Sequence, residues 1–316
     1  MPAGVSKFRQ QHEDTKKAQL KSDLKKCTAF SKKIKAVTPD GLQQCVKDID
    51  ALNLSNYVSE IAAAVIEVNY KITDVPLITQ ICIGLHRRYD EFTTPLLSGL
   101  RDNLLSLSDD ADKDAAKKKR IQLRLFIELF QVGLHDDEGF FVQLLTKLVG
   151  KSRGSNDGKK KPIDLPGLQV FMKFASEVLV GYVPSKLKTL ARQAGVKEEE
   201  VPSKCLTSSA CSRDLQMLVE DVFNTLCNGL KQAHKDMCSR RKKYDKDIGI
   251  HGALSEAKQA EMDQAEKLFE KLLAASQILA DASGKELPTL EEEKEEVDAT
   301  KGISVYQSGP LGDGGY

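Results

Sequence analysis

Three residues with metal-binding side chains are spaced so that one helix could carry them on a single side. Cys227, His234 and Cys238 lie seven and four residues apart, which is the spacing of neighbours on a helical face. A structural zinc site needs about four ligands that converge from different segments, and one helix supplies three of them poorly. We therefore interpret Cys227 and Cys238 as core cysteines and His234 as a surface residue, and we predict no metal ion.

A glycine-rich stretch and an acidic cluster resemble phosphate and calcium sites only in part. Three residues separate Gly154 from Gly158 and lysines follow, whereas a phosphate-binding loop has four residues between its glycines, then Lys and Ser or Thr. The acids at 136–138 lack the alternating pattern of a calcium loop, and acids at a helix start interact favourably with the helix dipole. We predict a polar loop at 151–163 and no cofactor.

Catalysis has no local signature in this chain. None of the five histidines lies in an HExxH motif or beside a Gly-x-Ser-x-Gly turn. The members of a catalytic triad are distant in sequence and leave no such motif, but helical scaffolds of this composition rarely contain one. We predict no catalytic residue, no small-molecule substrate and no enzymatic activity.

Basic side chains gather in three stretches that could attract a polyanion. Two lie at 25–35 and 117–120. The third, named the basic ridge from here on, consists of Lys231, Lys235, Arg240, Arg241, Lys242 and Lys243. Such clusters attract phosphates because counterions are released, although stacking aromatics are nearly absent, with Tyr244 and Phe30 the exceptions. Three interpretations stay open: a solvated helix face, a weak sequence-independent RNA contact, and a site for an acidic protein partner.

The apolar residues that must position these side chains recur at helical spacing nearly everywhere. Leu54, Val58 and Ile61 step by four and three residues, as on one side of a helix. No Asn-Gly or Asp-Gly turn joins two alternating runs, so no sheet is predicted. Start and stop signals predict helices over 11–36, from 55 onward, and over 74–90, 95–107, 111–133, 136–150, 166–183, 185–194, 211–246 and 253–282.

These helices are predicted to stack as hairpins. Helices with short connections pack antiparallel, and hairpins that cannot form a single bundle stack into an α-solenoid. We predict an all-α, HEAT-like solenoid of about five antiparallel hairpins, with four-helix bundles joined end to end as the alternative. Thr38-Pro39 is interpreted as the stop of the first helix. Tyr57, Tyr70 and Tyr89 are expected to be half-buried, with their hydroxyls at the rim.

Charge divides the chain into three regions. Residues 1–36 hold ten Lys and Arg against three Asp and Glu, and residues 286–298 hold seven Asp and Glu against one lysine. We predict a basic N-terminal helix over 1–38 that packs on the domain, a helical solenoid over 39–284, and an acidic disordered tail or linker over 285–316. The ending SGPLGDGGY indicates a fragment or a truncated gene model.

Composition excludes several classes of protein. Of the 316 residues 41% are hydrophobic and 29% charged, and the net charge of +1 favours no particular partner. No run approaches the ~20 apolar residues of a membrane span, and the N-terminus lacks the apolar segment of a secretion signal. Seven cysteines without a CxxC pair suit reduced thiols. We predict a cytoplasmic protein without a membrane contact.

Several stretches are more particular than helix periodicity requires. They read DLKKCTAFSKKIKAV (23–37), LNLSNYVSEIAAAVIEVNYKITDV (52–75), LHRRYDEFTTPLL (85–97), LRLFIELFQVGLHDDEGF (123–140) and GIHGALSEAKQ (249–259), leading into KLLAASQILAD (271–281). Over about residues 23–290 the chain resembles the middle-domain family, named after the central domain of the cap-complex scaffold subunit of translation initiation. The resemblance implies a crescent of HEAT-type helical pairs.

Within that family, the stretches are most similar to the members that act in nonsense-mediated mRNA decay. The resemblance implies a non-catalytic protein–protein scaffold, a monomeric domain whose partners are protein components of the mRNA surveillance complex. The alternatives are an RNA-binding module and a translation-initiation or splicing scaffold of the same helical family.

Overall fold

Helices are the regular elements of the part of the chain that the structure describes. The computed structural model describes residues 24–35, 38–67, 70–106, 113–150, 162–197, 200–202, 204–251 and 255–290. No strand occurs in these ranges, and the prediction of an all-α fold is confirmed. The predicted helical residues 11–23, the glycine-rich stretch at 151–161 and the acidic segment 291–316 lie outside the described residues.

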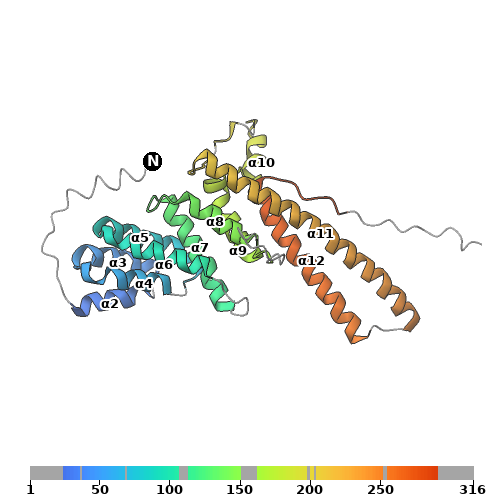
Figure 1. The fold of residues 1–316 in the computed structure, drawn as a ribbon, viewed down its shortest axis with the longest axis horizontal. Helices are drawn as coiled ribbons and strands as arrows, with labels where there is room; N and C mark the ends of the chain where they lie inside the picture. The colour runs from blue at the N-terminus through green and yellow to red at the C-terminus, as the bar shows by residue number, and fades with distance from the viewer. Residues whose placement is uncertain are drawn as a thin grey trace, which may run out of the picture.

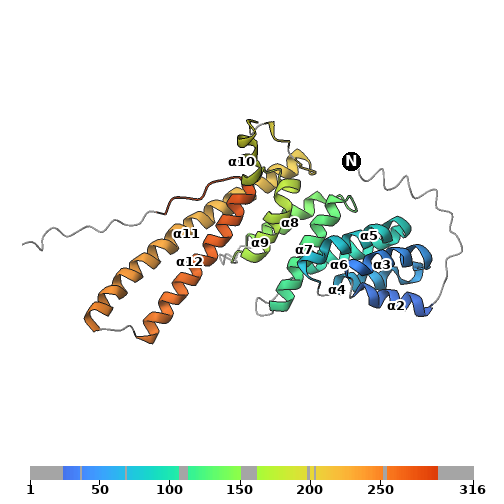
Figure 2. The same cartoon turned by 180° about the vertical axis from the view of Figure 1, so that it is seen from behind.

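Ten helices form two layers (Figures 1 and 2). One layer holds α2 (Leu24–Ile34), α4 (Val58–Glu67), α6 (Thr93–Leu105), α8 (Glu138–Leu148) and α11 (Ser209–His251). The other holds α3 (Pro39–Ala51), α5 (Val75–Arg88), α7 (Lys113–Gln131), α9 (Leu165–Ala175) and α12 (Glu256–Ser283). Along each layer every helix packs on the next, so consecutive helices alternate between layers. The described chain is therefore a solenoid of antiparallel hairpins, as predicted.

Short helical turns lie between several of the helices. Three of them are 3-10 turns before α4, α5 and α6: η1 (Ser55–Tyr57), η2 (Ile72–Asp74) and η3 (Asp90–Phe92). A π-helical turn, η4 (Ser176–Val180), follows α9 and ends at Gly181, whose φ is 79°. The short helix α10 (Ser185–Gln193) then packs on α12.

One predicted boundary was incomplete. The sequence predicts only that Thr38-Pro39 ends the first helix. In the structure the same dipeptide also begins α3, a helix that was not predicted. The Thr38 hydroxyl accepts a hydrogen bond from the backbone N–H of Gly41 at 3.2 Å, and Pro39 occupies the first turn. Proline disfavours a helical residue before it, yet its fixed φ suits the first turn of a helix. The same dipeptide therefore ends one helix and starts the next.

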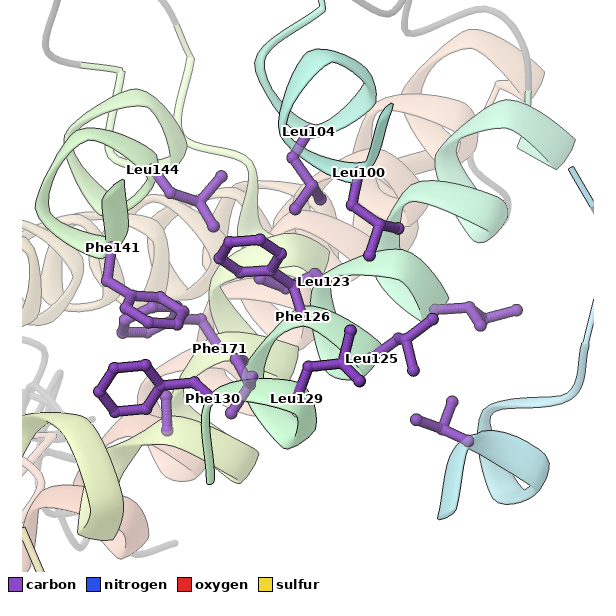
Figure 3. Packing of buried hydrophobic residues seen from close by; sticks show 14 of the residues in the cluster. Leu100, Leu104, Leu123, Leu125, Phe126, Leu129, Phe130, Phe141, Leu144 and Phe171 are labelled. Carbon is purple, nitrogen blue, oxygen red and sulfur yellow. The ribbon is translucent and has the colours of Figure 1, made fainter. Parts of the chain in front are cut away.

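The core is continuous through the stack and has an aromatic centre. Figure 3 shows Phe126 and Phe130 of α7 facing Phe141 of α8 and Phe171 of α9, beside leucines of α6. The rings of Phe126 and Phe141 lie 5.5 Å apart, edge to face. Neighbouring hairpins thus bury their apolar stripes against one another.

Two tyrosines are more buried than expected. Tyr57 is half-buried, as predicted. Tyr70 and Tyr89 are only 7% and 8% exposed, so the expectation for these two is wrong. The Tyr70 hydroxyl donates to the carbonyl of Ile34 at 3.3 Å. Full burial is possible because backbone groups of neighbouring segments satisfy the hydroxyls.

The last hairpin extends beyond the other four (Figure 1). Its residues belong to the common core only as far as Cys227 on α11 and from Ala275 on α12, with Leu272 at the boundary. Residues 228–251 and 255–274 are named the arm from here on. No described helix is both long enough and apolar enough to cross a bilayer.

Candidate functional site on the helical arm

An apolar seam holds the two helices of the arm together. On α11 it contains the buried Leu230, Ala233 and Tyr244, and on α12 the buried Met262. At about 100° per residue, the three α11 side chains lie roughly 200–260° around the helix from Lys231. The side of α11 that carries Lys231 therefore points away from α12.

Three residues of the basic ridge share this outward side. Lys231, Lys235 and Lys242 fall within about 40° of one another around α11, and all three are exposed. Lys246 falls within about 60° of Lys231 and extends the row. These four residues, named the lysine stripe, span roughly 22 Å of helix.

The two arginines of the ridge lie at the edges of the seam instead. The Arg240 Nη1 is 3.3 Å from the Oε2 of Glu261, and the Arg241 Nη2 is 3.1 Å from the Oε1 of Glu266. Glu261 also accepts a hydrogen bond from the Tyr244 hydroxyl at 2.7 Å, which raises the pKa of that phenol. The arginines therefore bind α12 rather than form part of the outward row.

The six residues that were predicted to form a single basic ridge thus fall into distinct sets. Lys243 lies about 120° from Lys231, between the stripe and the seam. Lys246 was missed in the sequence, although its position four residues after Lys242 places it on the same side. That the ridge binds a partner stays a prediction.

The two helices of the arm carry opposite charge. Residues 231–246 of α11 hold seven Lys and Arg against two Asp, whereas residues 256–271 of α12 hold five Asp and Glu against three Lys. Within the described chain, Lys231, Lys235 and Lys246 form no ion pair. Lys231, Lys235 and Lys246 are therefore solvated cations on the outward side of the arm, which attract anionic groups.

The three candidate metal ligands lie along one side of α11 but do not converge. The Nε2 of His234 is 3.6 Å from the Sγ of Cys238, and the imidazole lies 5.5 Å from the ring of Phe269. Burial raises the pKa of the Cys227 thiol, which disfavours the thiolate that a metal needs. Among the described residues, no three His, Cys, Asp or Glu side chains are grouped to hold a metal.

The other two basic stretches contribute to helix packing. Lys33 of α2 pairs with Asp48 of α3, with 2.9 Å between Nζ and Oδ2. The Lys119 Nζ donates to the carbonyl of Ser106 just after α6, at 2.5 Å. Cations near the carbonyl end of a helix are favoured by its dipole. One lysine of each stretch therefore binds a neighbouring segment, while Lys25, Lys26, Lys32 and Lys35 of the first stretch are exposed.

The arrangement of helices has counterparts in other proteins. The MIF4G domain family matches residues 18–152. Regulator of nonsense transcripts 2 of Homo sapiens and that of Mus musculus are each 27% identical over 300 residues, which is 94% of this chain and 23% of the relative. The chain therefore spans about a quarter of the length of these relatives. The crystal structure of the first MIF4G domain of human nonsense mediated decay factor UPF2 superposes with a TM-score of 0.73 at 25% identity, over 91% of this chain and 94% of that one.

Proposed function

We propose that this chain acts as a non-catalytic protein–protein scaffold in nonsense-mediated mRNA decay. It belongs to the MIF4G family and corresponds to the first MIF4G domain of UPF2. The observation that carries the proposal is the match of the whole stack to the first MIF4G domain of human UPF2, which includes the final hairpin because it covers 91% of the chain. The partners are protein components of the mRNA surveillance complex.

The proposed mechanism is positioning without bond making. A helical stack buries its apolar stripes between neighbours and leaves long outer surfaces for partners. The arm adds a lysine stripe that projects from the body, and an acidic segment of a partner protein fits it by charge. We place this activity in the cytoplasm, with the domain as a monomer.

The proposed organisation keeps three regions. Residues 1–38 form a basic helix that packs on the domain, residues 39–284 form the solenoid, and residues 285–316 form an acidic tail or linker. The described part of the first region supports this division, because Cys27, Phe30 and Ile34 are buried in the common core.

A domain exchange tests the scaffold function. In human cells depleted of Regulator of nonsense transcripts 2, this chain replaces the first MIF4G domain of that protein, and the half-life of a reporter mRNA with a premature stop codon is measured. We expect the exchange to restore rapid decay. A matched pair of variants then tests the stripe: Lys231→Glu with Lys235→Glu should slow decay, whereas Lys267→Glu with Lys271→Glu on α12 should not. A helical, expressed chimera that leaves the reporter stable would contradict the proposal.

A direct RNA contact is the second candidate, and the lysine stripe is the observation that favours it. Affinity for single-stranded RNA should then fall steeply with salt, with a slope of about −2 in log K against log salt if three lysines each neutralise a phosphate. Lys231→Glu, Lys235→Glu and Lys242→Glu together should abolish the binding. Arg240 and Arg241 are unsuitable targets, because their reversal also breaks the ion pairs with α12. Unchanged RNA affinity in the lysine variant would assign binding to another surface.

No structural observation favours a role in translation initiation or splicing. The relatives that cover nearly the whole chain are regulators of nonsense transcripts.

A further inference from the structure

The chain that follows α12 is held against α11. It turns at Gly284, whose φ is +66° and whose carbonyl accepts a hydrogen bond from the Lys188 Nζ at 3.0 Å. The next residue, Lys285, then places its Nζ 3.2 Å from the Oε1 of Glu220 and 5.6 Å from the ring centre of Phe223. Leu287 packs on the common core. Residues 285–287 are thus held beside the first third of α11.

One end of this anchor, Glu220, lies near the side of α11 that carries the lysine stripe, whereas Phe223 lies about 80° around the helix from Lys231. Glu220 and Lys231 are eleven residues apart, which is three turns and a difference of about 20° around the helix. Figures 1 and 2 show the described chain after α12 running in the direction in which α11 continues toward the end of the arm. The chain therefore leaves its anchor toward the end of the arm.

The residues that come next are strongly acidic. Residues 291–298, which lie outside the described residues, read EEEKEEVD and hold six Asp and Glu against one lysine. Glu291 and Glu296 are six and eleven residues beyond Lys285, a reach of up to roughly 20 and 40 Å for an extended chain. Measured from Glu220 along α11, the stripe begins at about 16 Å and ends at about 39 Å. The reach of Glu291 to Glu296 from Lys285 therefore matches the distances at which the stripe begins and ends.

We propose that residues 291–298 dock on the lysine stripe of α11 within the same chain. The acidic side chains pair with Lys231, Lys235 and Lys246, which form no ion pair within the described chain, and the anchor at Lys285 keeps their effective concentration in the millimolar range. The docked segment covers the surface that an anionic partner would use, so that a partner must displace it. Docking depends on salt, because the screening length falls from about 10 Å at 0.1 M to about 3 Å at 1 M. It does not depend on a role in mRNA decay.

Zero-length coupling with a carbodiimide tests the docking on the full 316-residue chain. The reagent joins lysine amines to carboxylates that already touch them, and mass spectrometry identifies the joined peptides. We expect Lys231 and Lys235 to couple to the acids of 291–298, with a yield that falls several-fold as salt is raised. Lys267 and Lys271 on α12 are the matched control, since they are exposed and have the same four-residue spacing. Equal coupling of the acidic segment to both lysine pairs would overturn the proposal.

Two controls make a negative result decisive. The ion pair of Lys258 with Asp247, 2.5 Å between Nζ and Oδ2, must couple under the same conditions. If it does and the stripe does not, residues 291–298 are not docked. Coupling between an isotopically labelled copy and an unlabelled copy would place the segment on a second molecule and overturn docking within one chain.

Lysine reactivity supplies an independent readout that needs no partner. Residues Glu291, Glu292, Glu293, Glu295 and Glu296 are changed to Gln, and amine acylation rates are compared with those of the unaltered chain. We expect Lys231 and Lys235 to react several-fold faster in the variant, and Lys267 and Lys271 to react at unchanged rates. Unaltered rates at Lys231 and Lys235 would contradict the docking, whatever the reporter assay shows.

Discussion

At the scale of single residues, the core contains polar side chains whose environment controls their charge. His135 is 7% exposed and lies among phenylalanines, with its ring 4.3 Å from that of Phe126. Its Nε2 is hydrogen-bonded to the Phe126 carbonyl at 3.0 Å, whereas its buried Nδ1 has no partner in the described chain. Burial lowers the pKa of His135 to about 4.

This histidine should make stability depend on pH. In the unfolded chain the imidazole binds a proton below about pH 6.5, whereas the folded chain binds it only below about pH 4. Between these values the unfolded state holds more protons, so the free energy of unfolding falls as pH drops, by about 3 kcal/mol in all. His135→Phe should remove that part of the dependence, and urea titrations from pH 8 to pH 4 measure it. The same pH slope in both proteins would assign the dependence to other groups.

A second buried site joins three helices of one layer. Arg124 and Glu128 of α7 are only 14% and 16% exposed and pair at 2.8 Å. Arg124 also donates to the Ile72 carbonyl before α5 and lies 4.3 Å from the ring centre of Phe174 in α9. Glu128 accepts a hydrogen bond from Thr79 of α5 at 3.1 Å.

Removing one partner of this pair should cost more than removing both. Arg124→Met leaves the Glu128 carboxylate largely buried without its counter-charge, and we expect a loss of about 3 kcal/mol. Arg124→Met with Glu128→Leu removes the uncompensated charge and should recover most of the loss. Chemical denaturation of the three proteins measures the difference. Equal destabilisation of the single and double variants would mean that packing, not charge, sets the cost.

At the scale of elements, helix ends decide how much of the fold is predictable. Apolar spacing predicted nearly all the helices, because burial of one stripe per helix needs only local periodicity. It missed α3, whose start signal was read as a stop at Pro39, and the π-helical turn at 176–180, which leaves no periodic signature. The site was partly predictable, since the spacing of Lys231, Lys235 and Lys242 already places them on one side. The role of Arg240 and Arg241 was not, because it depends on acids of α12 that are more than twenty residues away.

The end of α12 requires glycine. A Cβ on Gly284 would lie 2.5 Å from the Lys188 Cε and 2.6 Å from the Val183 carbonyl oxygen, and φ is +66°. Gly284→Ala should therefore destabilise the protein by at least about 2 kcal/mol and loosen α10 from α12. Gly249→Ala is the control, because this α11 glycine has open space around it and should gain about 0.5–1 kcal/mol. Thermal unfolding of both variants checks the pair, and a harmless Gly284→Ala would contradict the expected clash.

At the scale of the whole molecule, the stack and the arm differ in what holds them. The stack shares one continuous core, whereas the outer part of the arm is held by its own seam and by surface ion pairs. Surface ion pairs contribute at most about 1 kcal/mol each. The outer part of the arm should therefore be dispensable for folding of the stack.

Shortening the arm tests this independence. Replacing residues 231–271 by a short Gly-Ser turn keeps every arm residue that packs on the common core, including Leu272. We expect a single cooperative unfolding transition whose midpoint changes by only a few °C. Loss of cooperative unfolding would show that the arm is an integral part of the core.

A rod fixed only at its base converts rotation into displacement. The α11 part of the arm is about 36 Å long, and its base is the junction with the common core near Cys227 and Leu272. A tilt of about 5° at that junction moves the tip by roughly 3 Å, nearly one side-chain contact distance. A small change in packing at the base would thus displace a molecule bound near the tip, although the residues that this molecule contacts would stay the same.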